Sequence, residues 1–219
     1  MDPNRLAPGR ELGKPAFMPM QPDQPTRSPS SQRRGLFQRL LALGRDPNRA
    51  VKDAVYSRIV AAARQPVFYS TWNVPDTPLG RFEMLSLHMF LFLHRMREET
   101  GVAHALAQDL TDDFFTDVDH SLRELGIGDM GVPKRMKKLA RMFYGRATTY
   151  GAALDAGDAT ALTAALMRNV RPEAKEWAEA SALAGYALAA DSRLASQPTG
   201  AILSGAIEFP VAGAMGGEA

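Results

Sequence analysis

The stretch TPLGRFEMLSLHMFLFLHRMREET, residues 77–100, decides the fold of this chain. Thr77 is a favourable helix N-cap, and Pro78 suits the first helical position because its missing N–H would have no helical partner there. Over residues 84–93 the helix is apolar on almost every side, which indicates burial on most sides. This run is too short to span a bilayer. It therefore predicts a buried central helix over about residues 78–100.

Apolar residues at helical spacing continue on both sides of that stretch. They predict helices over about residues 50–63, from a cap at Thr111 to Leu125, and over about 134–150, 159–169 and 172–190. No part of the body shows the period-two alternation of a half-buried strand. The sequence predicts an all-α fold with a single helical domain, residues 50–190, around the central buried helix.

Both ends of the chain differ from this domain in composition. Residues 1–34 are basic and proline-rich, and we expect a disordered leader because proline fixes φ and lacks a backbone donor. Residues 35–49 form a short basic amphipathic segment, which fits either surface membrane attachment or packing on the domain. Residues 191–219 are rich in glycine and alanine, which predicts a tail. Residues 1–60 hold 11 Lys/Arg against 5 Asp/Glu, which favours an anionic partner or membrane surface.

The residues that carry chemistry form no complete site. The chain has no cysteine, which excludes disulfides, thiolate metal sites and cysteine nucleophiles. An acidic cluster, Asp112, Asp113, Asp117 and Asp119, suggests magnesium, but no second aspartate-rich motif completes it. Asp117 and His120 resemble one half of a di-iron motif whose other half is missing. We expect no catalytic residue, metal or cofactor. The alternative is a helical carboxylate-metal enzyme acting on a polyprenyl or quinone substrate.

A concentration of cations marks the helix predicted after Pro133. Four of them share one narrow arc of a helical wheel, with no acidic residue among them; these are Lys134, Lys137, Lys138 and Arg141, hereafter the basic cluster. Like charges one turn apart destabilise a helix by roughly a few tenths of a kcal/mol, so opposing charge is expected. It comes either from the acidic face of the preceding helix or from outside, as ribosomal RNA or a phospholipid surface. We predict that the basic cluster and Arg146 contact an anionic partner.

Three aromatic residues, Phe68, Tyr69 and Trp72, lie in a segment bounded by Pro66 and Pro75, which predicts a loop. Aromatic side chains in a loop are less easily explained as core than those on a helix face. They fit both packing over the central helix and an apolar partner surface. If a partner binds here, we predict these three residues as its apolar contacts.

Short motifs, taken in order over about residues 51–170, resemble the ubiquinol–cytochrome c chaperone family, which includes mitochondrial assembly factors for cytochrome b. They read ARQPVFY at 63–69, VPDTPLGRFEM at 74–84, LH at 87–88, DxDxxLRE at 117–124, GD at 128–129, VPK at 132–134, FYGR at 143–146 and RN at 168–169. Glu83 stands where the family usually has aspartate. The motif residues singled out are Pro75, Asp76, Thr77, Gly80, Arg81, His88, Asp117, Asp119 and Asp129.

This resemblance implies a helical, non-catalytic chaperone that holds newly made cytochrome b and promotes assembly of respiratory complex III. Mitochondrial relatives also act near the ribosomal exit tunnel with a small helper protein, so a ribosome and such a helper are further expected partners. We expect a cytoplasmic protein, peripheral at the inner face of the cytoplasmic membrane.

Arg81 is an unfavourable charge for its predicted position. It lies at the start of the central helix, where the helix dipole disfavours a cation. We therefore expect a carboxylate partner, either Asp76 or Asp129.

Overall fold

The structure, a computed structural model, describes residues 47–213, and every helix or strand assigned in that range is an α-helix. The predicted all-α fold is confirmed for this part of the chain. None of the helices in residues 47–213 is long and apolar enough to cross a bilayer. In chain order the helices are α2 (Pro47–Ala63), α3 (Pro66–Ser70), α4 (Pro78–Met96), α5 (Gly101–Glu124), α6 (Val132–Asp155), α7 (Ala159–Val170), α8 (Ala180–Ala195) and α9 (Thr199–Ile202).

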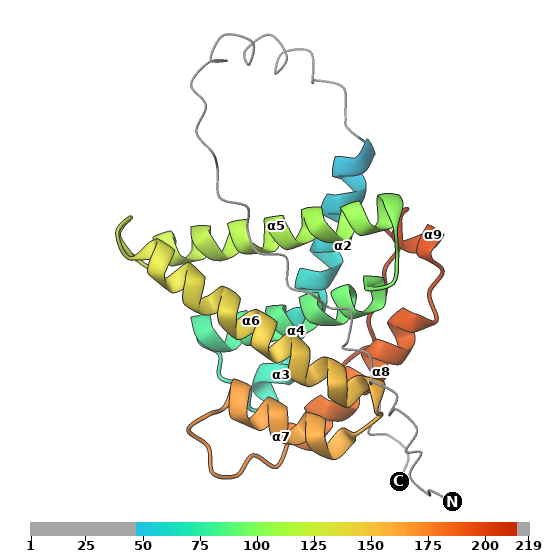
Figure 1. The fold of residues 1–219 in the computed structure, drawn as a ribbon. Helices are drawn as coiled ribbons and strands as arrows, with labels where there is room; N and C mark the ends of the chain where they lie inside the picture. Colours follow the sequence, from blue (N-terminus) through green and yellow to red (C-terminus); the bar gives the residue numbers. More distant parts are fainter. Residues whose placement is uncertain (1–46, 214–219) are drawn as a thin grey trace, which may run out of the picture. The chain divides into compact units, whose positions relative to one another are not determined.

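Helix α4 forms the centre of the fold, with α2, α5 and α8 packed against it (Figure 1). The predicted N-cap is confirmed, because the Thr77 side chain accepts a hydrogen bond from the backbone N–H of Gly80 at 3.1 Å. The side chains of Met84, Leu87 and Phe92 are buried, as are most others in the middle of the helix. The apolar stretch of α4 therefore supplies the predicted central helix.

The motif residues before α4 fix its first turn. A Cβ atom at Gly80 would lie only 1.9 Å from the carbonyl oxygen of Pro75, so only glycine fits this close approach. The Arg81 Nε donates a hydrogen bond to Asp76 Oδ1 at 2.6 Å. Of the two expected partners of Arg81, Asp76 is therefore the one that the structure places beside it. The hydrogen bond from Arg81 stabilises the ionised form of the Asp76 carboxyl group and so lowers the pKa of Asp76.

Helix α5 is longer than predicted because it begins at Gly101. Gly101 has a φ of 61°, a conformation that glycine adopts without strain, and it allows α5 to follow α4 directly. The helix then continues from residue 102 through Thr111, whose hydroxyl donates to the carbonyl of Ala107 at 2.8 Å. The predicted cap at Thr111 is wrong, because a threonine inside a helix can bond back to the preceding turn.

The segment before α8 forms turns where the sequence predicted a helix from residue 172. Trp177 is buried, and its Nε1 donates a hydrogen bond to the backbone carbonyl of Trp72 at 2.8 Å. This contact holds residues 171–179 against the segment between α3 and α4, and the helix begins only at Ala180. The helical boundary predicted at residue 190 also changes, because α8 ends at Ala195 and α9 follows.

The chain beyond α9 packs against the core as far as residue 212. Ile207 and Ala212 are buried there. Gln65 holds this segment: its Nε2 donates to the carbonyl of Pro210 at 3.2 Å, and its Oε1 accepts from the N–H of Ala212 at 2.7 Å. The predicted leader, and residues 35–46 of the predicted amphipathic segment, lie outside the described residues.

Candidate functional site

A buried ion pair joins α4 to α6. Glu83 Oε1 lies 2.8 Å from Arg146 Nη2, and the two side chains are 2% and 11% exposed. Burial raises the pKa of Glu83 to about 7, while the charge of Arg146 opposes that rise. The prediction that Arg146 contacts an anionic partner is corrected here, because its guanidinium faces an internal carboxylate instead of the surface.

A second polar pair lies beside the first. Asn169 Nδ2 on α7 donates a hydrogen bond to the hydroxyl of Tyr150 on α6 at 3.1 Å. Burial raises the pKa of Tyr150, and the nearby charge of Glu83 adds to this rise. Glu83, Arg146 and Asn169 come from three separate sequence motifs and meet between α4, α6 and α7. We did not predict this group; the signal that could have found it is the single carboxylate within the apolar face of α4.

His88 forms a third buried polar contact, on the other side of α4. Its Nδ1 lies 2.8 Å from the carbonyl oxygen of Met84, and its Nε2 lies 2.8 Å from the hydroxyl of Tyr186. Because a carbonyl only accepts, Nδ1 carries the proton and Nε2 accepts the hydroxyl proton of Tyr186. Burial lowers the pKa of His88 to about 4, so the ring is neutral at pH 7.

The neutral state of His88 predicts how acid affects stability. A histidine in the unfolded chain titrates near pH 6.5, whereas His88 in the fold titrates near pH 4. The unfolded state therefore binds more protons at this site, and the contribution of His88 to the free energy of unfolding falls by about 3 kcal/mol as pH drops from about 6.5 to 4. Glu83 contributes a change of opposite sign in the same range because its folded pKa is raised. Denaturant unfolding therefore compares the pH slopes of wild type and His88→Gln, and acid should cost the wild type about 3 kcal/mol more than the variant. Equal pH slopes would contradict it, since Glu83 titrates in both proteins.

The aromatic segment predicted as a loop contains α3, and part of it is core. Phe68 is fully buried, with its ring centroid 5.0 Å from that of Tyr186 and 5.6 Å from that of His88. The prediction of Phe68 as a partner contact is therefore wrong, because its side chain is covered by α4 and α8. Tyr69 and Trp72 are only partly buried at the edge of the same cluster, and their partner role stays a prediction.

The basic cluster lies on the exposed face of α6. None of its four side chains forms an ion pair with any residue between 47 and 213. The acidic face of α5 meets other groups: Asp113 lies 3.0 Å from Lys52 of α2, and Asp119 lies 2.6 Å from Arg123. The acidic face of α5 therefore does not neutralise the basic cluster, and contact of the basic cluster with an external anionic partner stays a prediction.

The acidic residues of α5 therefore act as local counter-charges. Asp129 also pairs with Arg123, and Asp117 lies beside Tyr56, whose pKa is raised by burial and further by that charge. Within residues 47–213, no group of three or more His, Asp or Glu side chains is arranged to hold a metal ion. The geometry gives the carboxylate-metal alternative no support.

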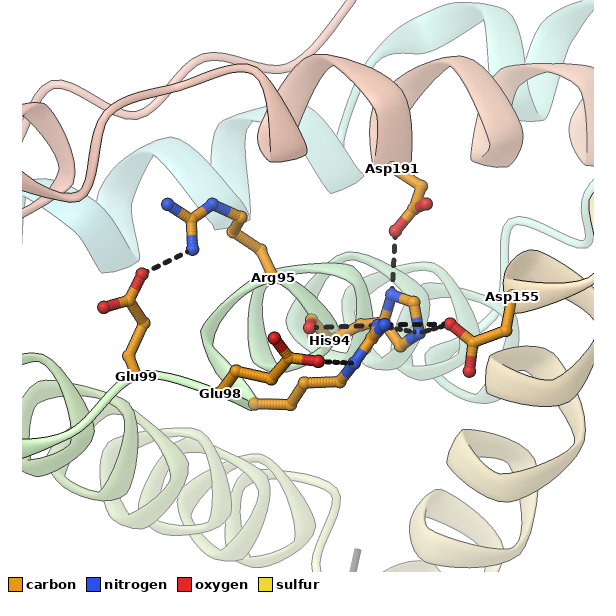
Figure 2. Close-up of polar contacts among 7 residues, drawn as sticks. His94, Arg95, Glu98, Glu99, Asp155 and Asp191 are labelled. Carbon is orange, nitrogen blue, oxygen red and sulfur yellow. Dashed lines mark hydrogen bonds and ion pairs between the residues drawn. The ribbon is translucent and has the colours of Figure 1, made fainter. Parts of the chain in front are cut away.

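A polar junction that sequence reasoning missed closes the C-terminal end of α4 (Figure 2). His94 lies between two carboxylates, with Nδ1 2.8 Å from Asp191 of α8 and Nε2 3.3 Å from Asp155 of α6. Arg95 pairs with Glu99 at 2.8 Å and donates to the hydroxyl of Thr199 at 2.9 Å. These two sets of contacts join the C-terminal end of α4 to α6, α8 and α9.

Comparisons with known proteins agree with this architecture. A family model described as ubiquinol-cytochrome C chaperone matches residues 70–209. The crystal structure of the Cbp3 homolog from Brucella abortus superposes with a TM-score of 0.73 at 56% identity, over 80% of this chain and 97% of that chain. Ubiquinol-cytochrome-c reductase complex assembly factor 1 of Xenopus laevis is 25% identical over 103 residues, 47% of this chain and 51% of that protein. The chain thus spans about half the length of that curated relative.

Proposed function

The chain belongs to the ubiquinol-cytochrome C chaperone family, and on that premise we propose that it is a non-catalytic assembly chaperone for ubiquinol–cytochrome c reductase, respiratory complex III. The single observation that carries this proposal is the family match over most of the described helices. The name of the frog relative, an assembly factor for the same complex, supports it further. Newly made cytochrome b is the proposed client.

The inside of the fold is compatible with a structural role for its titratable groups. Glu83 is paired with Arg146, and His88 is bonded to Tyr186, and each of these side chains is buried by neighbouring helices. Their contacts hold α4 against α6 and α8. A helical body joined internally in this way suits a protein that presents a surface to a client.

Two surfaces are the proposed contacts with partners. The basic cluster offers four exposed cations that form no ion pair with any other residue of the range 47–213, and such a field attracts anionic surfaces. Tyr69 and Trp72 offer partly exposed aromatic area near the start of α4. We place the protein at the inner face of the cytoplasmic membrane, where cytochrome b is inserted. A ribosome and a small helper protein stay as predicted partners.

Crosslinking in cells that build their respiratory chain tests this proposal. The protein carrying an affinity tag is crosslinked, purified and probed for cytochrome b, while complex III activity is compared between a deletion strain and its complemented form. Recovery of cytochrome b and loss of complex III activity on deletion are expected. Normal quinol oxidation in the deletion strain would overturn the proposal.

Reversing three charges of the basic cluster separates function from folding. We expect that Lys134→Glu, Lys138→Glu and Arg141→Glu together lower the amount of assembled complex III, because the variant repels its anionic partner. The melting temperature should change by no more than about 5 °C, since each of the three exposed substitutions usually alters stability by about 0.5 kcal/mol or less. The matched control reverses Arg58, Arg64 and Lys175, which are also exposed. A large fall in melting temperature would mean that the basic cluster supports the fold.

A further inference from the structure

The connection between α5 and α6 carries exposed apolar side chains that no part of the described fold covers. Met130 is 97% exposed and Leu125 is 56% exposed, and Ile127 between them is partly buried. Figure 1 shows this connection at the edge of the helices, away from α9. Large exposed apolar residues that lie together commonly mark a binding surface.

The connection between α5 and α6, together with the first turns of α6, is strongly cationic. Residues 123–141 contain six Lys/Arg and two Asp/Glu, and one of the two carboxylates, Asp129, is paired with Arg123. The remaining five cations, the basic cluster and Arg135, line one hollow of about 1060 Å³ together with Leu125 and Ile127. Apolar and positive side chains thus face the same space. We call the surface formed by these residues and Met130 the hairpin tip.

We propose that the hairpin tip docks on an anionic phospholipid surface, with Leu125 and Met130 entering the boundary between headgroups and acyl chains. Lysine and arginine beside an anionic leaflet contribute favourably to binding, and apolar side chains between them add the burial that a short segment needs. The basic cluster and Arg135, which have no ion-pair partner in the described part of the chain, supply the complementary charge. The inference rests on the membrane-peripheral location proposed above and names the surface that achieves it.

The composition of the hairpin tip favours lipid over single-stranded RNA. Binding to unpaired bases usually relies on aromatic side chains on which the bases stack. Apart from Asp129, which pairs with Arg123, the exposed side chains between the end of α5 and the start of α6 are aliphatic or contain a thioether, and no aromatic residue occurs in positions 123–141. Side chains such as Leu125 and Met130 gain more from the acyl boundary than from a phosphate backbone.

A fluorescent label on the full chain tests the docking directly. Because the chain has no cysteine, Met130→Cys creates one labelling site for an environment-sensitive dye. The control is Val102→Cys, which is also well exposed, at 67%, and lies at the opposite end of α5, roughly 35 Å away at the rise of an α-helix. Each labelled protein is titrated with vesicles of phosphatidylcholine alone or of phosphatidylcholine mixed with phosphatidylglycerol.

We expect a blue shift from the label at position 130 with the anionic vesicles, none with the neutral vesicles, and none from position 102. The triple charge reversal of the basic cluster should raise the lipid concentration for half-maximal shift at least about tenfold, even though the basic N-terminal segment is unchanged. No response at position 130 would overturn the inference, even if the protein sediments with the vesicles. A response to an RNA oligonucleotide and not to vesicles would overturn it as well.

These outcomes are independent of the chaperone test. A lipid-dependent shift without recovery of crosslinked cytochrome b would remove the proposed client and leave the docking surface in place. Recovery of cytochrome b without any shift at position 130 would retain the chaperone and remove the lipid surface.

Discussion

Replacing Arg146 with methionine is expected to lower the free energy of unfolding by about 3–5 kcal/mol near pH 8. The substitution leaves Glu83, whose side chain is 2% exposed, as a buried carboxylate without its counter-charge. Methionine fills much of the space of the arginine stem, so the loss reports mainly the charge. Urea unfolding followed by circular dichroism measures it.

The same variant should lose less stability in acid. The folded pKa of Glu83 is already raised to about 7 by burial, and removal of Arg146 raises it further. A carboxyl group whose pKa is higher in the folded state than in the unfolded state stabilises the fold in its protonated form. This stabilisation is lost as pH rises through the folded pKa. At about pH 5.5 Glu83 is therefore neutral in the variant. An equal loss at both pH values would contradict this account.

Glu83→Gln is the matched control for the ion pair. It leaves the guanidinium of Arg146, whose side chain is 11% exposed, without its carboxylate partner. The raised pKa of Glu83 makes the wild type more stable at about pH 5.5 than at pH 8, and glutamine cannot titrate, so the loss in Glu83→Gln should be larger at about pH 5.5, opposite in direction to that of Arg146→Met. The double variant Glu83→Leu with Arg146→Met should recover much of the lost stability, because a buried ion pair can be replaced by apolar side chains.

Phe68→Ala is expected to destabilise the protein by about 3–5 kcal/mol, because it opens a cavity in a fully buried aromatic cluster. The ring of Phe68 contacts those of Trp72, His88 and Tyr186. The lost contacts also loosen the packing around the hydrogen bond that Tyr186 donates to His88 on this side of α4. Thermal and denaturant unfolding of the purified variant measure the effect.

Leu79→Ala provides the comparison for Phe68, because it removes a large apolar side chain that is 51% exposed. Its expected change is within about 0.5 kcal/mol. If Phe68→Ala changed stability as little as Leu79→Ala and yet abolished recovery of cytochrome b, Phe68 would be a partner contact and its assignment to the core would be wrong.

Much of the fold could be predicted where local patterns determine it. The cap at Thr77 and the apolar run after it predict α4 because both depend on neighbours within one or two helical turns. Thr111 misled the prediction for the same reason, since a local preference for capping is overridden when the preceding residues also favour a helix. The core role of residues 203–212 depends on Gln65, which is far away in sequence.

The candidate sites show the same difference between local patterns and contacts of residues that are far apart in sequence. The basic cluster could be found because its residues lie within two turns of one helix. Pairing of Glu83 with Arg146 could not, because the two residues are 63 positions apart and nothing local indicates which cation reaches the carboxylate. The misplacement of Arg146 and Phe68 has one cause: charge and aromaticity were read from the sequence, but exposure follows from how the helices pack.

The clasp that Gln65 forms with Pro210 and Ala212 has a consequence for biosynthesis. Ile202, Ile207 and Ala212 fill space against helices that are translated much earlier. A nascent chain halted near codon 200 would leave Gln65 without these bonds and His88 without the ring of Phe209 beside it. Such a product would be a substrate for cellular proteases, so translation must proceed through this stretch before a durable molecule exists.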